Sequence, residues 1–202
     1  MPTQESRPKS PPSPSDAVSA VAVALLGGGV AVFPTDTVYG IAAHPKFPDA
    51  LERIYAIKRR RPDKPVAFLA SDADAPARLG FTMPPAARML AERFWPGALT
   101  LVLDGPDGTE GFRVPDNVFA IGVIAACGGL LRVTSANFSG EPPALDFKDL
   151  PKDFIAQCDV AIDGGKCPGG KASAVVRVAR DGSATVLREG DPEITRIVGE
   201  MK

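Results

Sequence analysis

The stretch VAVFPTDTVYG, residues 30–40, decides the fold class that we expect for this chain. Its first four residues are apolar and mostly β-branched or aromatic, which predicts a short strand buried on both faces. Polar residues follow this strand at once, and open α/β sheets bind their ligands where strands end. The stretch therefore predicts an α/β sheet with a candidate ligand site at the end of this strand.

The polar residues of this stretch suit a small polar ligand. Thr35 and Thr37 can exchange hydrogen bonds with it. Asp36 can hold an ammonium group, and the ring of Tyr39 can cover a ligand face. A simple turn after Pro34 explains the same residues equally well, because threonine and aspartate are common in turns.

Segments typical of helices and of strands alternate on both sides of this stretch. The helices that we expect cover residues 16–26, 48–60, 84–95, 116–129 and 191–201. The strands that we expect cover residues 30–33, 66–70, 98–103, 130–135, 159–163, 174–179 and 184–189. This alternation, followed by three closely spaced strands, favours an α/β fold with a mixed β-sheet and flanking helices.

The composition indicates one globular core and no nucleic-acid coat. The 202 residues are 45% hydrophobic, which is enough for one sizeable core. A net charge of −1 lacks the basic excess typical of proteins that coat DNA or RNA. Three cysteines and one histidine offer neither a closed disulfide set nor a zinc site, so we expect a cytoplasmic protein without a metal held by protein ligands. No apolar run is long enough to cross a membrane.

The first fifteen residues differ in composition from the rest. Residues 1–15 contain five prolines and four serines, so they cannot bury enough apolar surface to become ordered. We expect a flexible tail there and a single domain over residues 16–202. Asp16 is the expected N-cap of the first helix.

Positive charge is concentrated in one short stretch, AIKRRRPDKP, residues 56–65. Five cations stand within seven positions, namely Lys58, Arg59, Arg60, Arg61 and Lys64. A local cluster in a nearly neutral chain favours a phosphate site over a nucleic-acid surface. The alternative is a solvated helix end, where the helix dipole also stabilises cations.

Two further stretches are candidate ligand contacts. In TSANFSG, residues 134–140, Ser135 and Asn137 lie two apart and share one face of an extended segment. A turn that caps the next helix explains them as well. The glycine-rich residues 162–173 predict a flexible loop, which can close over a ligand but lacks the P-loop spacing.

Six stretches together resemble the YrdC-like family of threonylcarbamoyl-AMP synthases. They are FPTDTVYGI, IYAIKRRRPDKPV, FWPGALTLVL, FRVP, TSANFSGEPP, and SAVVRV followed by VLREG. They occur in the family's order and cover about residues 18–190. The resemblance implies a twisted mixed sheet around a concave, positively charged cleft. It also implies the short form, without the C-terminal domain that some members carry.

The resemblance implies an ATP-dependent reaction assisted by Mg²⁺. L-Threonine and bicarbonate would condense to a carbamate, which attacks the α-phosphate of ATP. The products would be threonylcarbamoyl-adenylate and pyrophosphate. A downstream tRNA threonylcarbamoyltransferase would use the adenylate to form threonylcarbamoyladenosine in tRNA. The protein could also contact RNA directly, and we expect no membrane partner.

The resemblance and the chemistry of the strand end together assign residues to these substrates. The residues expected at the reacting groups are Lys58, Arg60, Ser135 and Asn137. The expected nucleotide contacts are Arg60, Lys64, Thr109, Asn137, Leu145 and Arg188. The expected threonine contacts are Thr35, Thr37, Tyr39, Arg113, Ser135 and Ser173. Arg113 would pair with the threonine carboxylate, because its planar guanidinium matches that group. Arg59 and Arg61 are expected to be solvated.

Two other functions stay open at this point. A double-stranded RNA or tRNA-binding module of the same fold could use the same cleft to track phosphates, although aromatic residues are not interleaved with the cations. A paralogue with another carbamoyl or nucleotide substrate would share the ATP-binding residues.

Overall fold

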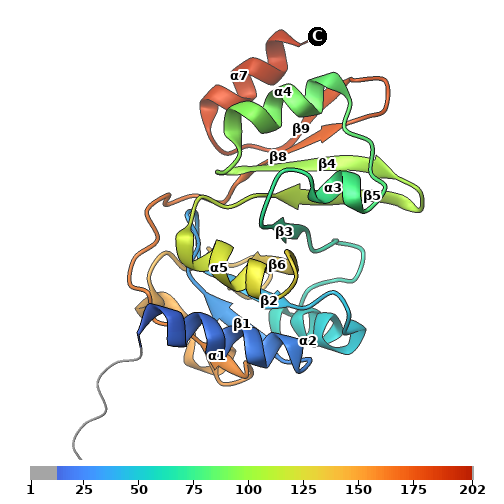
Figure 1. Ribbon diagram of the computed structural model, residues 1–202. Helices are drawn as coiled ribbons and strands as arrows, with labels where there is room; N and C mark the ends of the chain where they lie inside the picture. Colours follow the sequence, from blue (N-terminus) through green and yellow to red (C-terminus); the bar gives the residue numbers. More distant parts are fainter. Residues whose placement is uncertain (1–12, 202) are drawn as a thin grey trace, which may run out of the picture.

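The computed structural model describes residues 13–201 and contains one large mixed sheet (Figure 1). Among these residues nine strands lie in the order β7-β1-β2-β6-β3-β5-β4-β8-β9. The strands are β1 Val30–Phe33, β2 Gly40–Ala43, β3 Phe68–Ala70, β4 Leu99–Gly105, β5 Gly108–Arg113, β6 Leu130–Ser135, β7 Val160–Ala161, β8 Ala174–Val178 and β9 Ala184–Arg188. Parallel pairs join β1 to β7, β3 to β5 and β4 to β8, and the other neighbours are antiparallel. The expected α/β fold with a mixed sheet is confirmed.

Helices cover both faces of the sheet. They are α1 Pro14–Leu26, α2 Pro48–Lys58, α3 Ala75–Arg78, α4 Pro85–Phe94, α5 Val118–Ala126, α6 Lys152–Ile155 and α7 Pro192–Glu200, with a 3₁₀ turn, η1, at Phe147–Asp149. α1 and α5 pack side by side on one face of β1, β2, β6 and β3, whereas α2 packs on the other face of β1 and β2. α4 and α7 pack on β4, β5 and β8 at the far end of the sheet (Figure 1).

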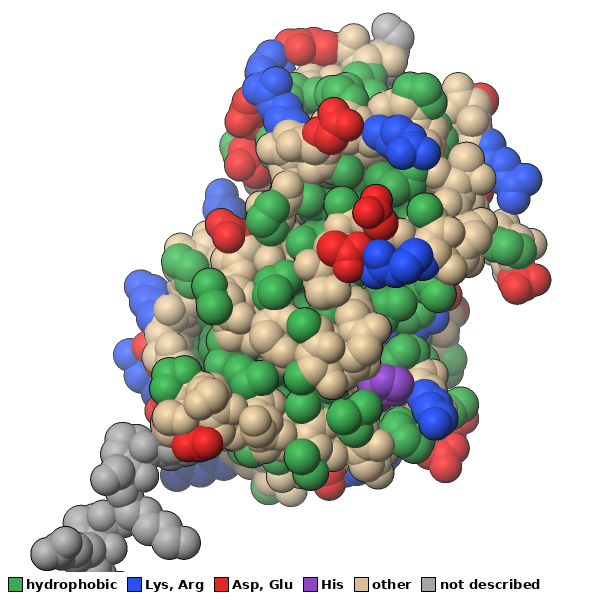
Figure 2. Space-filling view, in the orientation of Figure 1, with side chains coloured by type: hydrophobic (Ala, Val, Ile, Leu, Met, Phe, Trp, Pro, Cys, Tyr) green, Lys and Arg blue, Asp and Glu red, His purple; other side chains and the backbone are tan. Residues whose placement is uncertain are grey.

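The outer surface of α1 and α5 carries almost no charge. The segments 17–35 and 117–131 contain no Asp, Glu, Lys or Arg. The space-filling view accordingly shows mostly hydrophobic and neutral side chains over these two helices, with charged side chains gathered nearer the edges (Figure 2). No helix within residues 13–201 has the length and apolarity that crossing a bilayer requires.

The first helix begins earlier than we expected. Ser13, and not Asp16, is the N-cap, and its hydroxyl accepts a hydrogen bond from the backbone N–H of Asp16. The Asp16 carboxylate accepts one from the backbone N–H of Ser13 in return, which completes a capping box. Pro14 and Ser15 therefore belong to α1, so the expected tail boundary at residue 15 was wrong. The rest of that tail, residues 1–12, lies outside the described residues.

Two strands were missing from the sequence prediction. β2 consists of glycine, isoleucine and two alanines, and β5 contains two glycines and a glutamate, so both have low intrinsic strand propensity. β5 forms because it pairs with β4 through a two-residue turn between Gly105 and Gly108. The short α3, α6 and η1 were also not predicted.

Candidate functional site

A cavity of about 440 Å³ lies on the face of the sheet opposite α4 and α7. Strand alternation forms it, because Leu99, Leu101 and Leu103 of β4 face the helices while Thr100 and Val102 face the cavity. The cavity is lined by Thr35, Thr37, Val38, Tyr39, Gly40, Arg60, Pro65, Ala67, Leu69, Thr100, Val102, Thr109, Gly111, Arg113, Val133, Thr134, Ser135, Ala172, Ser173, Val175, Arg177, Leu187 and Arg188.

Glycines keep part of the cavity floor open. A Cβ atom on Gly40 would lie 2.8 Å from the Val133 side chain. One on Gly111 would lie 3.0 Å from the Cβ of Ala67. Side chains at these two strand positions would occupy space that a ligand can use instead.

The cavity brings together most of the residues that the sequence assigned to a site. Nine of them line it, namely Thr35, Thr37, Tyr39, Arg60, Thr109, Arg113, Ser135, Ser173 and Arg188. Four expected contacts are not among the lining residues: Lys58, Lys64, Asn137 and Leu145. Lys64 is exposed and Leu145 is half-buried, while Lys58 and Asn137 are buried behind the cavity wall.

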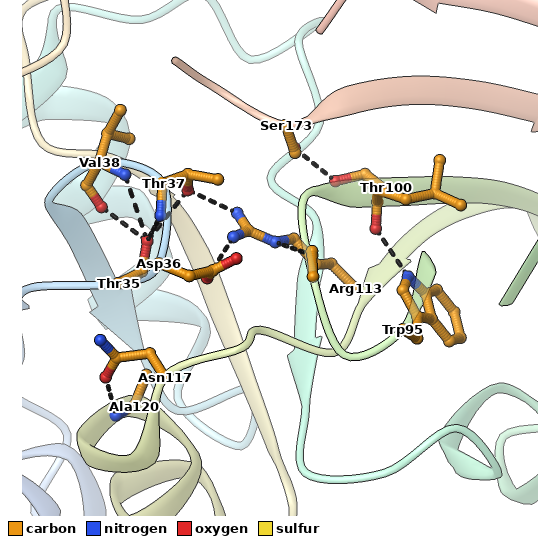
Figure 3. A network of polar contacts seen from close by, with 12 residues as sticks. Thr35, Asp36, Thr37, Val38, Trp95, Thr100, Arg113, Asn117, Ala120 and Ser173 are labelled. Atoms are coloured by element: carbon orange, nitrogen blue, oxygen red, sulfur yellow. Dashed lines mark hydrogen bonds and ion pairs between the residues drawn. The ribbon is translucent and has the colours of Figure 1, made fainter. Parts of the chain in front are cut away.

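Arg113 is held in place from three directions (Figure 3). Its Nε donates to the carbonyl of Gly97 at 2.9 Å, and its Nη1 donates to the hydroxyl of Thr37 at 2.9 Å. Its Nη2 forms an ion pair with Asp36 at 2.5 Å, and both side chains are about nine-tenths buried. A guanidinium has five N–H groups, so two stay available for an anion in the cavity. Asp36 therefore orients Arg113, a role that the sequence did not reveal.

The loop after β1 is both a turn and a site. The Thr35 hydroxyl accepts hydrogen bonds from the backbone N–H groups of Thr37 and Val38, and donates to the Val38 carbonyl at 2.8 Å. This local bonding presents the Thr37 hydroxyl to Arg113. Across the cavity, the hydroxyls of Thr100 and Ser173 lie 2.9 Å apart (Figure 3). Thr100 was not predicted, although alternation along its strand would have placed it on this face.

Tyr39 does not cover the cavity with its ring as we expected. The ring is fully buried in the core and packs edge-on against Phe147. Its hydroxyl donates to the carbonyl of Gly165 at 2.7 Å and accepts from the N–H of Gly164 at 3.1 Å. Burial raises the pKa of the Tyr39 hydroxyl to about 12, so it stays protonated and keeps donating. Tyr39 thus ties the glycine-rich loop to the strand end.

The glycine-rich loop packs tightly on that strand end. Gly169 donates its N–H to the carbonyl of Asp36 at 2.9 Å, and a Cβ on Gly169 would lie 2.5 Å from the same oxygen. Cys167 donates its N–H to the carbonyl of Leu145 at 2.7 Å. Gly169 therefore allows the backbone of the loop to approach the backbone of the strand end closely, which a residue with a side chain could not do.

Lys58 lies at the end of α2 and points behind the cavity wall. Its ammonium donates to the carbonyl of Ser135, to the carbonyl of Asn137 at 2.8 Å and to the Asn137 Oδ1 at 3.4 Å. That Oδ1 also accepts from the Ser135 hydroxyl at 2.5 Å. Only 1% of Lys58 is exposed. Lys58 and Asn137 therefore hold the segment that carries Ser135.

Burial of Lys58 predicts a pH-dependent stability. Desolvation, aided by nearby Arg60, lowers the pKa of Lys58 from 10.5 to about 7. Between these values the unfolded chain binds a proton that the folded chain has released, so stability rises with pH. We expect the free energy of unfolding to rise by about 2 kcal/mol from pH 7 to pH 9 through this residue. Urea unfolding at both pH values should show this rise in the wild type and lose it in Lys58→Met. Equal pH dependence in the two proteins would contradict the assignment.

Arginines Arg60 and Arg188 face the cavity near Arg113. Arg60 donates to the carbonyls of Lys64 and Pro65 at 3.0 and 3.1 Å, which closes the loop that follows α2. Arg188 donates to the carbonyl of Ser173 at 3.0 Å and to its hydroxyl at 3.2 Å. Burial first, and then the charges of Arg113 and Arg60, lower the pKa of Arg188. Within residues 13–201 neither Arg60 nor Arg188 has a carboxylate partner, so an anion in the cavity would relieve their repulsion.

The remaining cations of the basic stretch lie elsewhere. Arg61 is exposed and pairs with Asp63 at 2.9 Å. Arg59 is exposed as well, but its guanidinium lies 4.4 Å from the centre of the Phe138 ring, so it is not simply solvated. Arg177, which was not predicted, borders the cavity and pairs with Asp104 at 3.1 Å.

Sequence comparison finds relatives across most of the chain. The family model Sua5_yciO_yrdC, described as "Telomere recombination", matches residues 23–190. The threonylcarbamoyl-AMP synthase of Bacillus subtilis is 35% identical over 94% of this chain and 59% of that protein. The enzyme of the same name from Pyrococcus abyssi is 32% identical over 87% of this chain and 55% of that protein. The chain thus spans less than two thirds of these two relatives. A putative threonylcarbamoyl-AMP synthase from Mycobacterium leprae is 34% identical over 89% of this chain and 86% of its own length.

Solved structures show the same architecture. P. abyssi Sua5 complexed with L-threonine superposes with a TM-score of 0.85 and 30% identity, over 95% of this chain and 59% of that one. E. coli YciO superposes with a TM-score of 0.77 and 26% identity, over 89% of this chain and 91% of that one. From the family match and these relatives together, the chain belongs to the Sua5/YciO/YrdC family.

Proposed function

We propose that the chain is a threonylcarbamoyl-AMP synthase, a nucleotidyltransferase that uses L-threonine, bicarbonate and ATP. The observation that carries the proposal is one cavity with two kinds of arginine. Arg113 is fixed by Asp36 and Thr37, while Arg60 and Arg188 lack carboxylate partners in the described part of the chain. The first suits a carboxylate in a defined orientation, and the other two suit phosphates.

Threonine would bind at the end of the cavity formed by Arg113. The two free N–H groups of its guanidinium would receive the threonine carboxylate. Thr35, Thr37 and Ser173 surround this end with hydroxyl groups that can bond to the amino acid. The structure of P. abyssi Sua5 complexed with L-threonine supports threonine as the ligand, and the placement at Arg113 rests on the contacts described above.

ATP would bind toward Arg60 and Arg188, and these arginines would make this part of the cleft positively charged. Thr109 lines the same cavity, and we include it among the nucleotide contacts. Lys64 and Leu145 do not line it and would contact only a part of the nucleotide that extends beyond it, while Asn137 would act through Ser135. Mg²⁺ would enter with the triphosphate, since residues 13–201 contain no group of three His, Cys, Asp or Glu side chains that could hold a metal. Phosphate oxygens and water are ligands that Mg²⁺ accepts readily.

The chemistry needs positioning and charge neutralisation more than a base. An oxygen of the threonine carbamate would form a bond to the α-phosphorus of ATP, and the bond from that phosphorus to the bridging oxygen would break to release pyrophosphate. Arg60 and Ser135 face the cavity and would stabilise the charge that develops on phosphorus. Lys58 and Asn137 would hold Ser135 in place from behind.

The same proposal extends to the setting of the enzyme. Residues 14–201 would act as one catalytic domain, because one sheet runs through them. The adenylate product is reactive and would pass to a transferase that modifies tRNA. Such a role would place the chain in the cytoplasm, where its three free cysteines would stay reduced.

The test is pyrophosphate release from purified protein. We expect release with L-threonine, bicarbonate, ATP and Mg²⁺ together, and background release when threonine is omitted or replaced by alanine. L-Threonine at 100 times its Kd should also stabilise the fold by about 2.7 kcal/mol in a melting assay. Pyrophosphate release indifferent to threonine would refute the proposal. A steeply salt-dependent shift of tRNA in a gel, without threonine-dependent release, would favour an RNA-binding module instead.

A further inference from the structure

Arg59 ends α2 in a conformation that glycine normally takes. Within residues 13–201 it is the one residue other than glycine with a positive φ, at φ 51° and ψ 41°. Its N–H bonds to the carbonyl of Ala56 at 3.0 Å, and the N–H of Arg60 bonds to the carbonyl of Tyr55 at 2.9 Å. These two bonds are those of the Schellman motif, in which glycine usually stands at the left-handed position. Arginine there carries a steric cost that glycine avoids.

The Arg59 side chain makes a contact that glycine cannot make. Its guanidinium stacks over the ring of Phe138 at 4.4 Å, and Phe138 is buried. A cation over an aromatic face is attracted to the ring electrons. Phe138 follows Asn137, whose carbonyl accepts a hydrogen bond from the Lys58 ammonium. The side chain therefore joins the end of α2 to the loop after β6.

The backbone makes a second connection at the same place. The carbonyl of Lys58 accepts a hydrogen bond from the N–H of Ser139 at 2.8 Å. The left-handed turn at Arg59 also separates its two neighbours, because Lys58 is buried behind the cavity wall while Arg60 lines the cavity. The turn thus directs Lys58 and Arg60 to different places, and the stack on Phe138 fixes this turn against the loop after β6.

We propose that Arg59 is a positioning residue that clamps the end of α2 onto residues 135–139. The clamp sets where the Arg60 guanidinium lies relative to the Ser135 hydroxyl in the cavity. What the cavity binds rests on the proposed function, whereas the clamp itself rests only on these contacts. Arg59 stabilises the site through Phe138 and does not touch the substrates.

Arg59→Gly is the decisive variant, because it relieves the left-handed backbone and removes the stack at once. Its melting temperature should equal or exceed that of the wild type. Its affinity for ATP should fall about tenfold, with L-threonine affinity within about twofold, because Arg60 is displaced and Arg113 is not. Amide exchange at Ser139 should become about tenfold faster, since its partner carbonyl lies on the released helix end.

Three further variants separate the clamp from a purely structural role. Arg59→Lys keeps a cation above the ring and should restore ATP affinity to within about twofold of wild type. Phe138→Leu keeps the site apolar but removes the aromatic face, and should reproduce the loss seen in Arg59→Gly. Arg61→Gly is the matched control, because Arg61 is exposed and pairs only with Asp63 among the described residues; its ATP affinity should be that of the wild type.

Two results would overturn the clamp. One is wild-type ATP affinity and wild-type Ser139 exchange in Arg59→Gly. The other is a loss shared equally by Arg59→Gly, Arg59→Lys and Arg61→Gly, which would indicate a general effect of charge. If the wild type releases no pyrophosphate with threonine, the proposed function fails, and Ser139 exchange still decides whether the clamp exists.

Discussion

Arg113→Lys is expected to raise the L-threonine concentration needed for half-maximal rate about 100-fold, because losing a bidentate charged hydrogen-bond pair costs about 2–3 kcal/mol. Lysine keeps a positive charge beside the buried Asp36 carboxylate, so the fold is not left with an unpaired charge. It cannot reproduce the planar fork that bonds to Gly97 and Thr37 while receiving a second carboxylate. ATP affinity should stay within about threefold of wild type, since Arg113 would not bind phosphates.

The measurement is the rate of pyrophosphate release at varied threonine, with ATP affinity measured separately. Arg132→Lys is the matched control. Arg132 forms a two-bond ion pair with Glu110 at 2.6 and 2.8 Å and stacks on Phe68, but it does not line the cavity. That variant should lose stability without a change in threonine dependence. An unchanged threonine requirement in Arg113→Lys would remove Arg113 from the proposed threonine site.

Arg188→Ala is expected to weaken ATP binding about 30-fold, because losing a charge-assisted hydrogen bond to a phosphate costs about 2 kcal/mol. The melting temperature of this variant should not fall. The reason for the unchanged stability lies in the surroundings of Arg188. Partial desolvation and the charges of Arg113 and Arg60 lower the pKa of Arg188, but the residue is exposed, so solvent screens most of this repulsion and the fold depends little on this cation. Removing it therefore leaves the ligand-free fold nearly unchanged and removes a phosphate partner in the bound state.

Thermal melting and ATP titration of the same samples test both halves of this expectation. Arg180→Ala serves as the control, because it removes an exposed arginine near the same end of the sheet that does not line the cavity. Its ATP affinity should match that of the wild type. If Arg188→Ala loses stability but binds ATP normally, Arg188 has a structural role and the nucleotide binds elsewhere.

Most elements could be predicted because their side chains repeat with the period of the element. The strand at 30–33 is apolar throughout, and the helix that begins at Pro48 ends within two residues of the expected position. β2 and β5 could not be predicted, because glycine and alanine give no strand signal until a neighbouring strand supplies hydrogen-bond partners. The Ser13 cap was missed because Asp16 suits the same role, and only the backbone course distinguishes the two.

The sequence predicted most of the residues that line the candidate site, but it predicted less well where their side chains lie. Residues of six separated segments, including Thr37, Arg60 and Arg188, do line one cavity. The sequence could not show that Lys58 turns away from that cavity while Arg60, two residues later, faces it. Nor could it show that Asp36 is occupied by Arg113, since the two stand 77 positions apart.

The sequence by itself determined the alternation of helices and strands, the family of the chain and the polar side chains that end its strands. These properties depend on residue type and on spacing along the chain, which are local. The tertiary structure alone decided which side chains share the cavity, which cations are paired, and how the left-handed turn at Arg59 divides Lys58 from Arg60. Those outcomes depend on hydrogen bonds and packing between strands and loops that are far apart in sequence, so they exist only in the folded chain.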